Sequence, residues 1–328
     1  MLGRRDPVYR AYWAFAAKRQ QAFLRRAAGD SPPWTDDSII NRFKFTNAYR
    51  ASDRVSQFLI RDVIYRDGFS ADDTLLRIVL FRLFSKTSTW QALERELGPI
   101  RRATISTRRL AHVLERLHAR GPIYTSAFIL CANDAYGHTR KFLNHIALVR
   151  DMFRARRLPT AVASARSLGA LYEALLAYPL IGPFMGYQLA IDINYSELVD
   201  FDEDDFTIGG PGAERGIQKI FPTARRRDMT RIIQWMTDNQ EAEAAKLGIE
   251  LPTLYGRRLH AVDCQNLFCE LDKYARVAFP ELKSNRSRIK AAFTPSPEPL
   301  ELFYPPKWCL NDRLPPVAQL QLGLAVAN

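Results

Sequence analysis

The sequence contains few residues of the kind that bind metals. Four cysteines occur in 328 residues, none of them in a C-x-x-C pair, and the five histidines are scattered without ligand spacing. This pattern predicts no zinc site and no iron–sulfur cluster, and it fits a reduced, cytoplasmic setting. Cys131, Cys264 and Cys269 lack a recognisable activating partner, so we expect none of them to act as a nucleophile.

Two catalytic motifs and a long apolar run are also missing. The absence of G-x-x-x-x-G-K-[ST] excludes a P-loop kinase as far as that motif goes, and there is no G-x-S-x-G elbow. The uncharged stretch at residues 174–188 is broken by two prolines and is shorter than the roughly 20 residues that a bilayer requires. The N-terminus lacks the apolar run of a secretory signal, so we expect no membrane partner.

Positive charge, in contrast, is abundant. The chain carries 47 Lys and Arg against 35 Asp and Glu, a net charge of +12. Clusters of this kind predict a broad positive surface suited to a polyanion, and arginine favours bidentate contacts with phosphate. The clusters are Arg25-Arg26, Arg101-Arg102, Arg108-Arg109, Arg156-Arg157, Arg225-Arg226-Arg227 and Arg257-Arg258.

Hydrophobic spacing of three and four residues predicts a mainly α protein, with two helical lobes flanking a groove. We expect one helical catalytic domain over residues 1–294. Seven prolines in residues 295–316 predict an extended C-terminal strap over residues 295–328. The expected helices are residues 46–66, 72–84, 89–97, 107–120, 141–156, 168–177, 227–246 and 263–279.

Residues 175–194 have the pattern of a helix-hairpin-helix. An apolar helix stops at Pro179, the chain turns through Gly182, and a second helix starts after Pro183. Backbone amides at the start of the second helix can hold a DNA phosphate, so Gly182 and Gly186 are candidate DNA contacts. An ordinary helical hairpin in a core is an equally good interpretation of this pattern alone.

Two polar stripes run along helices that are otherwise apolar. The amides, carboxylates and arginines in them are typical of groups that orient a ligand in a cavity, and Asp53 and Gln265 lie just beside the stripes. An interhelical ion-pair network is the alternative. One stripe comprises Asn47, Arg50, Arg54, Gln57 and Arg61, and the other comprises Asp263, Asn266, Glu270 and Lys273.

Further candidates come from shorter patterns. Tyr187, Gln188 and Asp192 lie on the second hairpin helix, where the last two could meet a flipped base; Tyr187 fits a core position equally well. Gly210 and Gly212 fit an anion-binding loop or a plain tight turn. Lys141 shares a helical turn with Asn144 and His145 and could face DNA.

Several of these segments together resemble a known family. The family comprises the glycosylase-fold proteins of phage thymine hypermodification, called α-glutamyl/putrescinyl thymine pyrophosphorylases, whose members act as amino acid:DNA transferases. A related helical domain accompanies the 5-hydroxymethyluracil DNA kinases. The resemblance runs from about Asn41 to Phe279, and it is carried by residues 47–57, 80–87, 179–188, 210–216 and 263–274.

The resemblance implies a helix-hairpin-helix DNA glycosylase-like fold and a substrate: double-stranded DNA whose 5-hydroxymethyluracil a kinase has pyrophosphorylated. A free amino acid replaces the pyrophosphate, and no other cofactor is expected. Arg50 and Arg54 would hold the pyrophosphate, and Glu270 or Asp263 would deprotonate the amine. The groups expected to orient the substrates are Asn47, Asp53, Gln57, Tyr187, Gln188, Asp192, Asp205, Gln265, Asn266 and Lys273.

One departure separates this sequence from a glycosylase. Glycosylases of this fold use an Asp just ahead of the helix that follows the hairpin, whereas this chain has Gly210, Pro211 and Gly212 there, and its acids, including Asp205, fall earlier. We therefore favour a transferase, using glycine or serine since an arginine-lined site repels polyamines. Excision of a modified thymine and non-catalytic DNA binding are the alternatives.

The clustered arginines predict that DNA affinity falls steeply with salt. A protein that neutralises about five or more phosphates releases a similar number of counterions, so the dissociation constant should rise by orders of magnitude between low and moderate salt. Titrating a labelled duplex at several KCl concentrations measures this slope. A flat response would remove DNA from the list of partners.

Overall fold

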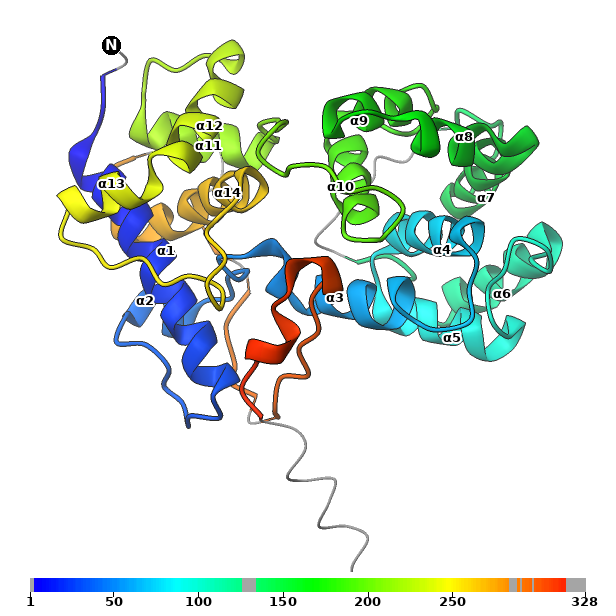
Figure 1. The fold of residues 1–328 in the computed structure, drawn as a ribbon, viewed down its shortest axis with the longest axis horizontal. Coiled ribbons are helices and arrows are strands. Elements are labelled where there is room, and N and C mark those ends of the chain that lie inside the picture. Colours follow the sequence, from blue (N-terminus) through cyan, green and yellow to red (C-terminus); the bar gives the residue numbers. More distant parts are fainter. Residues whose placement is uncertain (1–2, 126–133, 283–287, 290, 297, 317–328) are drawn as a thin grey trace, which may run out of the picture. The chain divides into compact units, whose positions relative to one another are not determined.

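A computed structural model describes residues 3–125, 134–282, 288–289, 291–296 and 298–316. It is mainly helical, which confirms the predicted fold class, and no β-strand occurs within these ranges, only isolated bridges such as Phe43 with Ala292. The chain divides into two compact units (Figure 1). The first comprises Met1–Asp53 and Phe206–Asn328, and the second comprises Arg54–Asp205. The groove stays a prediction. Cys131, which we expect not to act as a nucleophile, lies outside the described residues.

The first unit is built around α14 (Ala261–Ala278), which packs against α1 (Asp6–Ala27) and α11 (Pro211–Ile220) (Figure 1). Tyr12 of α1 donates from its hydroxyl to the carbonyl of Cys264, 3.2 Å away. The remaining helical elements of this unit are α2 (Ser38–Arg42), η1 (Arg50–Ser52), η4 (Arg226–Asp228), α12 (Met229–Asp238), α13 (Gln240–Lys246), η5 (Pro306–Trp308) and η6 (Asn311–Arg313).

The second unit is built around α4 (Ala71–Phe84), which is buried over most of its length. A helix that is covered on all sides needs apolar residues all round, and α4 supplies them apart from Asp73 in its first turn and the two arginines Arg77 and Arg82. Both guanidinium groups are paired: Arg77 with Glu94 at 2.7 Å, and Arg82 with Asp192 at 2.8 Å. The other elements are α3 (Arg54–Phe58), η2 (Leu59–Ile64), α5 (Thr87–Leu97), α6 (Thr107–Arg120), α7 (Lys141–Phe153), η3 (Arg154–Arg156), α8 (Arg157–Ser164), α9 (Leu168–Leu176) and α10 (Pro183–Asn194).

The predicted helix over residues 46–66 is wrong in its first part, since continuous helical structure begins at Arg54. Residues 46–49 are not helical, Asp53 is extended (ψ 144°), and a π-helix occupies Leu59–Ile64. Side chains take over the bonds that a helix would make: the backbone N–H of Asn47 donates to Asp53 at 2.7 Å, and the Asn47 amide donates to the carbonyl of Ser52 at 2.6 Å. Asn and Asp compete with helical backbone bonds in this way, so the helix gives way to a loop.

Other boundaries agree more closely. The helix predicted over residues 107–120 is α6, and the hairpin helices are α9 and α10 with the expected turn between them. The predicted helix over residues 227–246 is divided into α12 and α13 at Asn239. The 22-residue α1 was not predicted, although Pro7 in its first turn and the spacing of Val8, Tyr12 and Phe15 carry a helical signal.

Gly216 allows α11 to lie against α14. A Cβ atom built there would stand 1.9 Å from the carbonyl oxygen of Phe268, and one built on Gly212 would stand 2.8 Å from the sulfur of Cys269. The two glycines, four residues apart, therefore line the same face of α11. Close packing of two helices explains Gly212 without an anion.

Gly216→Ala should destabilise the protein by about 3 kcal/mol, because the new methyl group would meet a backbone atom that cannot rotate away. Urea unfolding followed by circular dichroism measures the change. Gly182→Ala is the matched control, since a Cβ atom at Gly182 meets nothing within 4 Å. Equal midpoints for Gly216→Ala and the wild type would contradict the packing role.

Candidate functional site

A polar cluster in the first unit joins the loop at residues 46–53 to α1. Arg19 of α1 donates from Nε to the carbonyl of Thr46 at 2.9 Å and from Nη2 to Oδ1 of Asn47 at 2.5 Å. Asn47 in turn donates its backbone N–H to Asp53. One arginine thus fixes the segment that presents a carboxylate, and burial lowers the pKa of that arginine.

The predicted polar stripe of α14 lies on one face of that helix, and its side chains contact the same loop. Oε2 of Glu270 accepts the backbone N–H of Thr46 at 3.1 Å and the ammonium of Lys273 at 2.7 Å. The Asn266 amide donates to the Thr46 hydroxyl at 3.0 Å. We call Arg19, Asn47, Asp53, Asn266, Glu270 and Lys273 the central polar cluster.

Asp263 fastens the loop to the first turn of α14. Its Oδ1 accepts the backbone N–H of Arg50 at 2.7 Å, and its Oδ2 accepts that of His260 at 3.1 Å. Burial raises the pKa of Asp263, and the two N–H donors oppose this rise. Because both carboxylate oxygens accept backbone donors, Asp263 is better placed to hold the loop than to accept a proton from a substrate.

Asp53 is the carboxylate whose acidity suits proton transfer. Desolvation raises its pKa to about 7, the Asn47 N–H opposes the rise, and the negative charge of Glu270 adds to it. A group with this pKa exchanges protons readily near neutral pH. Cys269, beside the cluster, behaves differently, since burial raises the pKa of its thiol to about 12, as expected for an inert cysteine.

The C-terminal segment reaches the same loop. The hydroxyl of Tyr304 lies 2.8 Å from that of Ser52, and Tyr304 is completely buried. The side chain of Asn311 holds the backbone of Tyr304 through two hydrogen bonds of 2.9 Å. Hydrophobic periodicity did not point to Tyr304 or Arg19, because neither lies in a helix that it identified.

The other predicted site residues are divided between the two units. Arg54 is exposed and Gln57 buried on α3, both in the second unit, so the first predicted stripe is not one helix face. In the first unit, Arg50 is buried, and the buried Gln265 contacts the sulfur of Cys269 at 3.6 Å. Asp205 is exposed in the second unit.

On α10 the predicted base-binding residues are buried. Arg82 holds the carboxylate of Asp192 in a bidentate contact, and both side chains are at most 1% exposed. Tyr187 and Gln188 are also buried. These contacts favour a structural role for Asp192, and the burial of Tyr187 agrees with the core position that is its alternative interpretation.

The predicted DNA-binding glycines have differing surroundings. Gly182 precedes α10 in open space, whereas a Cβ atom at Gly186 would press on Tyr172 and Leu176. Gly210 precedes Pro211 at the start of α11. The Lys141 ammonium lies 4.4 Å from the centre of the Tyr124 ring. Contact with DNA stays a prediction for all of them.

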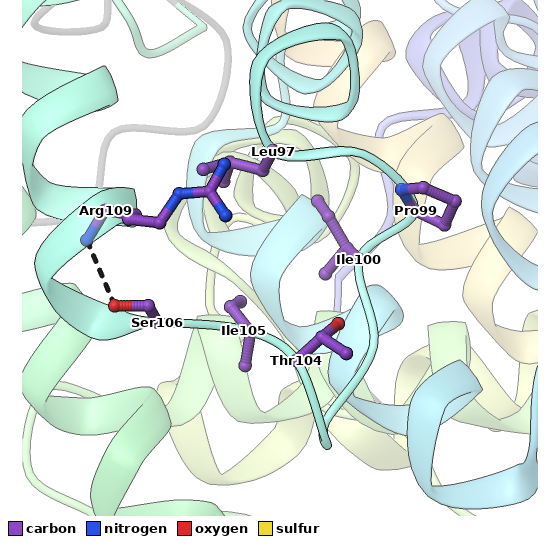
Figure 2. Close-up of a pocket in the computed structure, with 7 residues that line it drawn as sticks. All are labelled: Leu97, Pro99, Ile100, Thr104, Ile105, Ser106 and Arg109. Atoms are coloured by element: carbon purple, nitrogen blue, oxygen red, sulfur yellow. Dashed lines mark hydrogen bonds between the residues drawn. The ribbon is translucent and has the colours of Figure 1, made fainter.

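Two hollows in the surface contain none of the predicted residues. The one in Figure 2, between α5 and α6, has a volume of about 10 Å³, which is room for one water molecule. The second, of about 350 Å³, is lined by prolines, Trp34, Asn41 and Phe293 and holds no charged group. No helix in the described ranges has the length and apolar character that crossing a bilayer demands.

Comparison with known proteins shows a match to one protein family. A model described as "5-hmdU DNA kinase, helical domain" matches residues 6–284. The chain is 27% identical over 297 residues to a 5-hmdU DNA kinase of Bacillus phage SP10. That match covers 83% of this chain but 46% of the relative, so the chain spans less than half of the relative's length. No solved structure matches.

Replacing Asp53 should alter how stability depends on pH. Its folded pKa of about 7 lies above the ordinary 3.8, so its contribution to stability is fully present below about pH 4 and is lost as the pH rises through 7. We expect Asp53→Asn to reduce the loss of unfolding free energy between pH 5 and pH 8 by about 1–2 kcal/mol, allowing for partial exposure. Urea unfolding at both pH values measures this.

Asp238→Asn, on the exposed end of α12, controls for the loss of one negative charge. If Asp53→Asn and Asp238→Asn changed the pH dependence equally, the assignment of the titration to Asp53 would be wrong.

Proposed function

The chain belongs to the family of 5-hmdU DNA kinase helical domains, and from this premise we propose that it acts on 5-hydroxymethyluracil in phage DNA. We further propose that it is an amino acid:DNA transferase. The sequence lacks a P-loop motif, so the chain would receive a base that a kinase has already pyrophosphorylated. The observation that carries the transferase proposal is the central polar cluster, which combines a carboxylate of pKa about 7 with nearby cations.

The proposed reaction exchanges one bond for another at the exocyclic methylene of the base. The amine nitrogen of the amino acid forms a bond to that carbon, and the carbon–oxygen bond to pyrophosphate breaks, so pyrophosphate leaves with the electron pair. The ammonium proton passes to a carboxylate of the protein. The glycosidic bond is untouched, and the strand keeps all of its bases.

Asp53 is the proposed base, in place of the Glu270 or Asp263 favoured by the sequence. Asp263 accepts two backbone donors, and Glu270 is paired with Lys273, whereas Asp53 has the pKa matched to deprotonating an ammonium near neutral pH. Lys273, whose side chain is 32% exposed, and Arg50 are the proposed cations for the departing pyrophosphate.

A second candidate is a non-catalytic DNA-binding module that works with a kinase. The observation that favours it is the family match itself, because the matching domain is the helical part of a 5-hmdU DNA kinase and covers residues 6–284. A module of this kind would bind 5-hydroxymethyluracil DNA and leave it chemically unchanged.

Incubating the protein with pyrophosphorylated 5-hydroxymethyluracil DNA and a mixture of amino acids should yield a new nucleoside by mass spectrometry. One pyrophosphate should be released per base modified, and no site should become labile to hot alkali, because the base stays on its sugar. Alkali-labile strands without pyrophosphate release would instead identify a glycosylase. Tight binding with unchanged nucleosides would identify the non-catalytic module.

Asp53→Asn should lower the rate of product formation by about 10²–10⁴-fold, the usual contribution of a general base, while DNA affinity stays within about twofold. Product measured against time, with DNA binding measured in parallel, checks this. Asp238→Asn should keep the wild-type rate. A fully active Asp53→Asn variant would remove Asp53 from the reaction.

A further inference from the structure

The positive charge of the second unit is concentrated in one part of its sequence. Residues 101–166 hold 13 Arg and Lys but only 3 Asp and Glu, a net charge of +10. Residues 167–205 hold 8 Asp and Glu and no Arg or Lys. Nearly all of the chain's excess charge therefore falls on the segment that contains α6, α7 and α8.

Helix α6 turns an apolar face to the protein and a basic face to solvent. Leu110, Val113 and Leu114 are buried, and α6 packs against α5 and α7. The exposed side chains at spacings of three and four are Arg109, His112, Arg116 and Arg120, with Arg108 beside them. We call these five residues the α6 surface.

Acidic residues neutralise only part of the positive charge of the α6 surface. The one acidic residue of α6, Glu115, is paired with Arg140, and Arg116 is paired with Glu96 of α5. Arg108 and Arg120 are exposed and have no ion-pair partner among the described residues. Exposed like charges held on one rigid helix repel one another, and an anionic partner relieves that repulsion.

Arg109 has a different position from its neighbours. Figure 2 shows its side chain folded back over Leu97, and its Nη2 donates to the carbonyl of Glu96 at 3.4 Å. The backbone N–H of Arg109 also donates to Ser106, the N-cap of α6, at 3.3 Å. Because this residue helps to join α6 to α5, it is unsuitable for a test of binding.

We propose that the α6 surface binds the phosphate backbone of duplex DNA, independently of base sequence and of base modification. The surface extends over about 16 Å from Arg109 to Arg120 at 1.5 Å per residue. A duplex presents about nine phosphate charges over this length, and guanidinium groups match phosphate in a bidentate geometry. A membrane does not fit, because the apolar face of α6 is buried inside the unit.

The choice of DNA as the polyanion rests on the proposed function, and the test separates the two. Arg108→Gln/Arg120→Gln removes two charges from the α6 surface. Arg10→Gln/Arg288→Gln, the matched control, removes two exposed arginines of the first unit that lie outside the arginine clusters and likewise have no ion-pair partner among the described residues. Binding of each protein to a short unmodified duplex is measured across a KCl series.

The α6 variant should weaken binding at low salt by about tenfold, and its slope of log affinity against log salt should be shallower by about 2, since each lost phosphate contact removes about 0.9. The control should keep the wild-type slope. Arg108→Lys/Arg120→Lys, which retains both charges, should restore the slope. Helical circular dichroism should be equal in all four proteins.

A wild-type slope in the α6 variant, or an equal loss in the control, would overturn the proposal. Displacement of the duplex by polyglutamate at equal charge concentration would overturn it as well, since it would identify a surface for acidic proteins. Nucleoside mass spectrometry on the same proteins distinguishes the two proposals. Duplex binding that depends on the α6 surface, without amino acid transfer, would refute the transferase alone; transfer with binding that is indifferent to that surface would refute the α6 proposal alone.

Discussion

The candidate site depends on the two hydrogen bonds that the carboxylate of Asp263 accepts from the backbone of Arg50 and His260. These bonds hold the loop at residues 46–53 to the first turn of α14, and the loop positions Asp53. Helix α14 is in turn fixed by Gly216, whose missing side chain lets α11 reach the carbonyl of Phe268. The position of Asp53 therefore depends on the packing of α11 against α14 as well as on the hydrogen bonds of its own loop.

The charge of a buried carboxylate is neutralised by one cation in the second unit and by three in the first. In the second unit Arg82 and Asp192 form a one-to-one pair that is almost completely enclosed, and such a pair is stable only when both partners are present. In the first unit Asp272 is surrounded by Arg215, Lys219 and Arg276. Asp53 lies in neither arrangement, since its strongest contact is a backbone N–H. Desolvation raises its pKa to about 7, because the Asn47 N–H and the charges of Arg19 and Arg50 offset the burial only in part.

Local sequence signals predicted α6 and the α9–α10 hairpin well, because an apolar face, a Ser N-cap and the Gly182–Pro183 turn are all encoded within a few residues. The same signals failed over residues 46–53, where helical structure was predicted and a loop is found. There the local bonds of Asn47 act together with bonds from Thr46 to Glu270 and from Arg50 to Asp263, more than 200 residues away in the sequence. The stripe on α14 was predicted because it lies on one regular helix, while Arg19 and Tyr304 were missed because only the tertiary fold brings them to the loop.

Proton transfer and phosphate binding, the two proposed activities, differ in how precisely the side chains must be positioned. Proton transfer depends on a fixed position and a shifted pKa, so it needs buried groups whose hydrogen bonds leave little freedom, as in the central polar cluster. Attraction to phosphate acts over about 8–10 Å at physiological salt and tolerates flexible side chains, so exposed arginines on one rigid helix are sufficient. A chain that had to do both would gain by keeping the binding charge away from the reacting carboxylate, because further cations beside Asp53 would lower its pKa and weaken it as a base. The concentration of charge in residues 101–166 places the proposed binding arginines on helices other than the loop that carries Asp53.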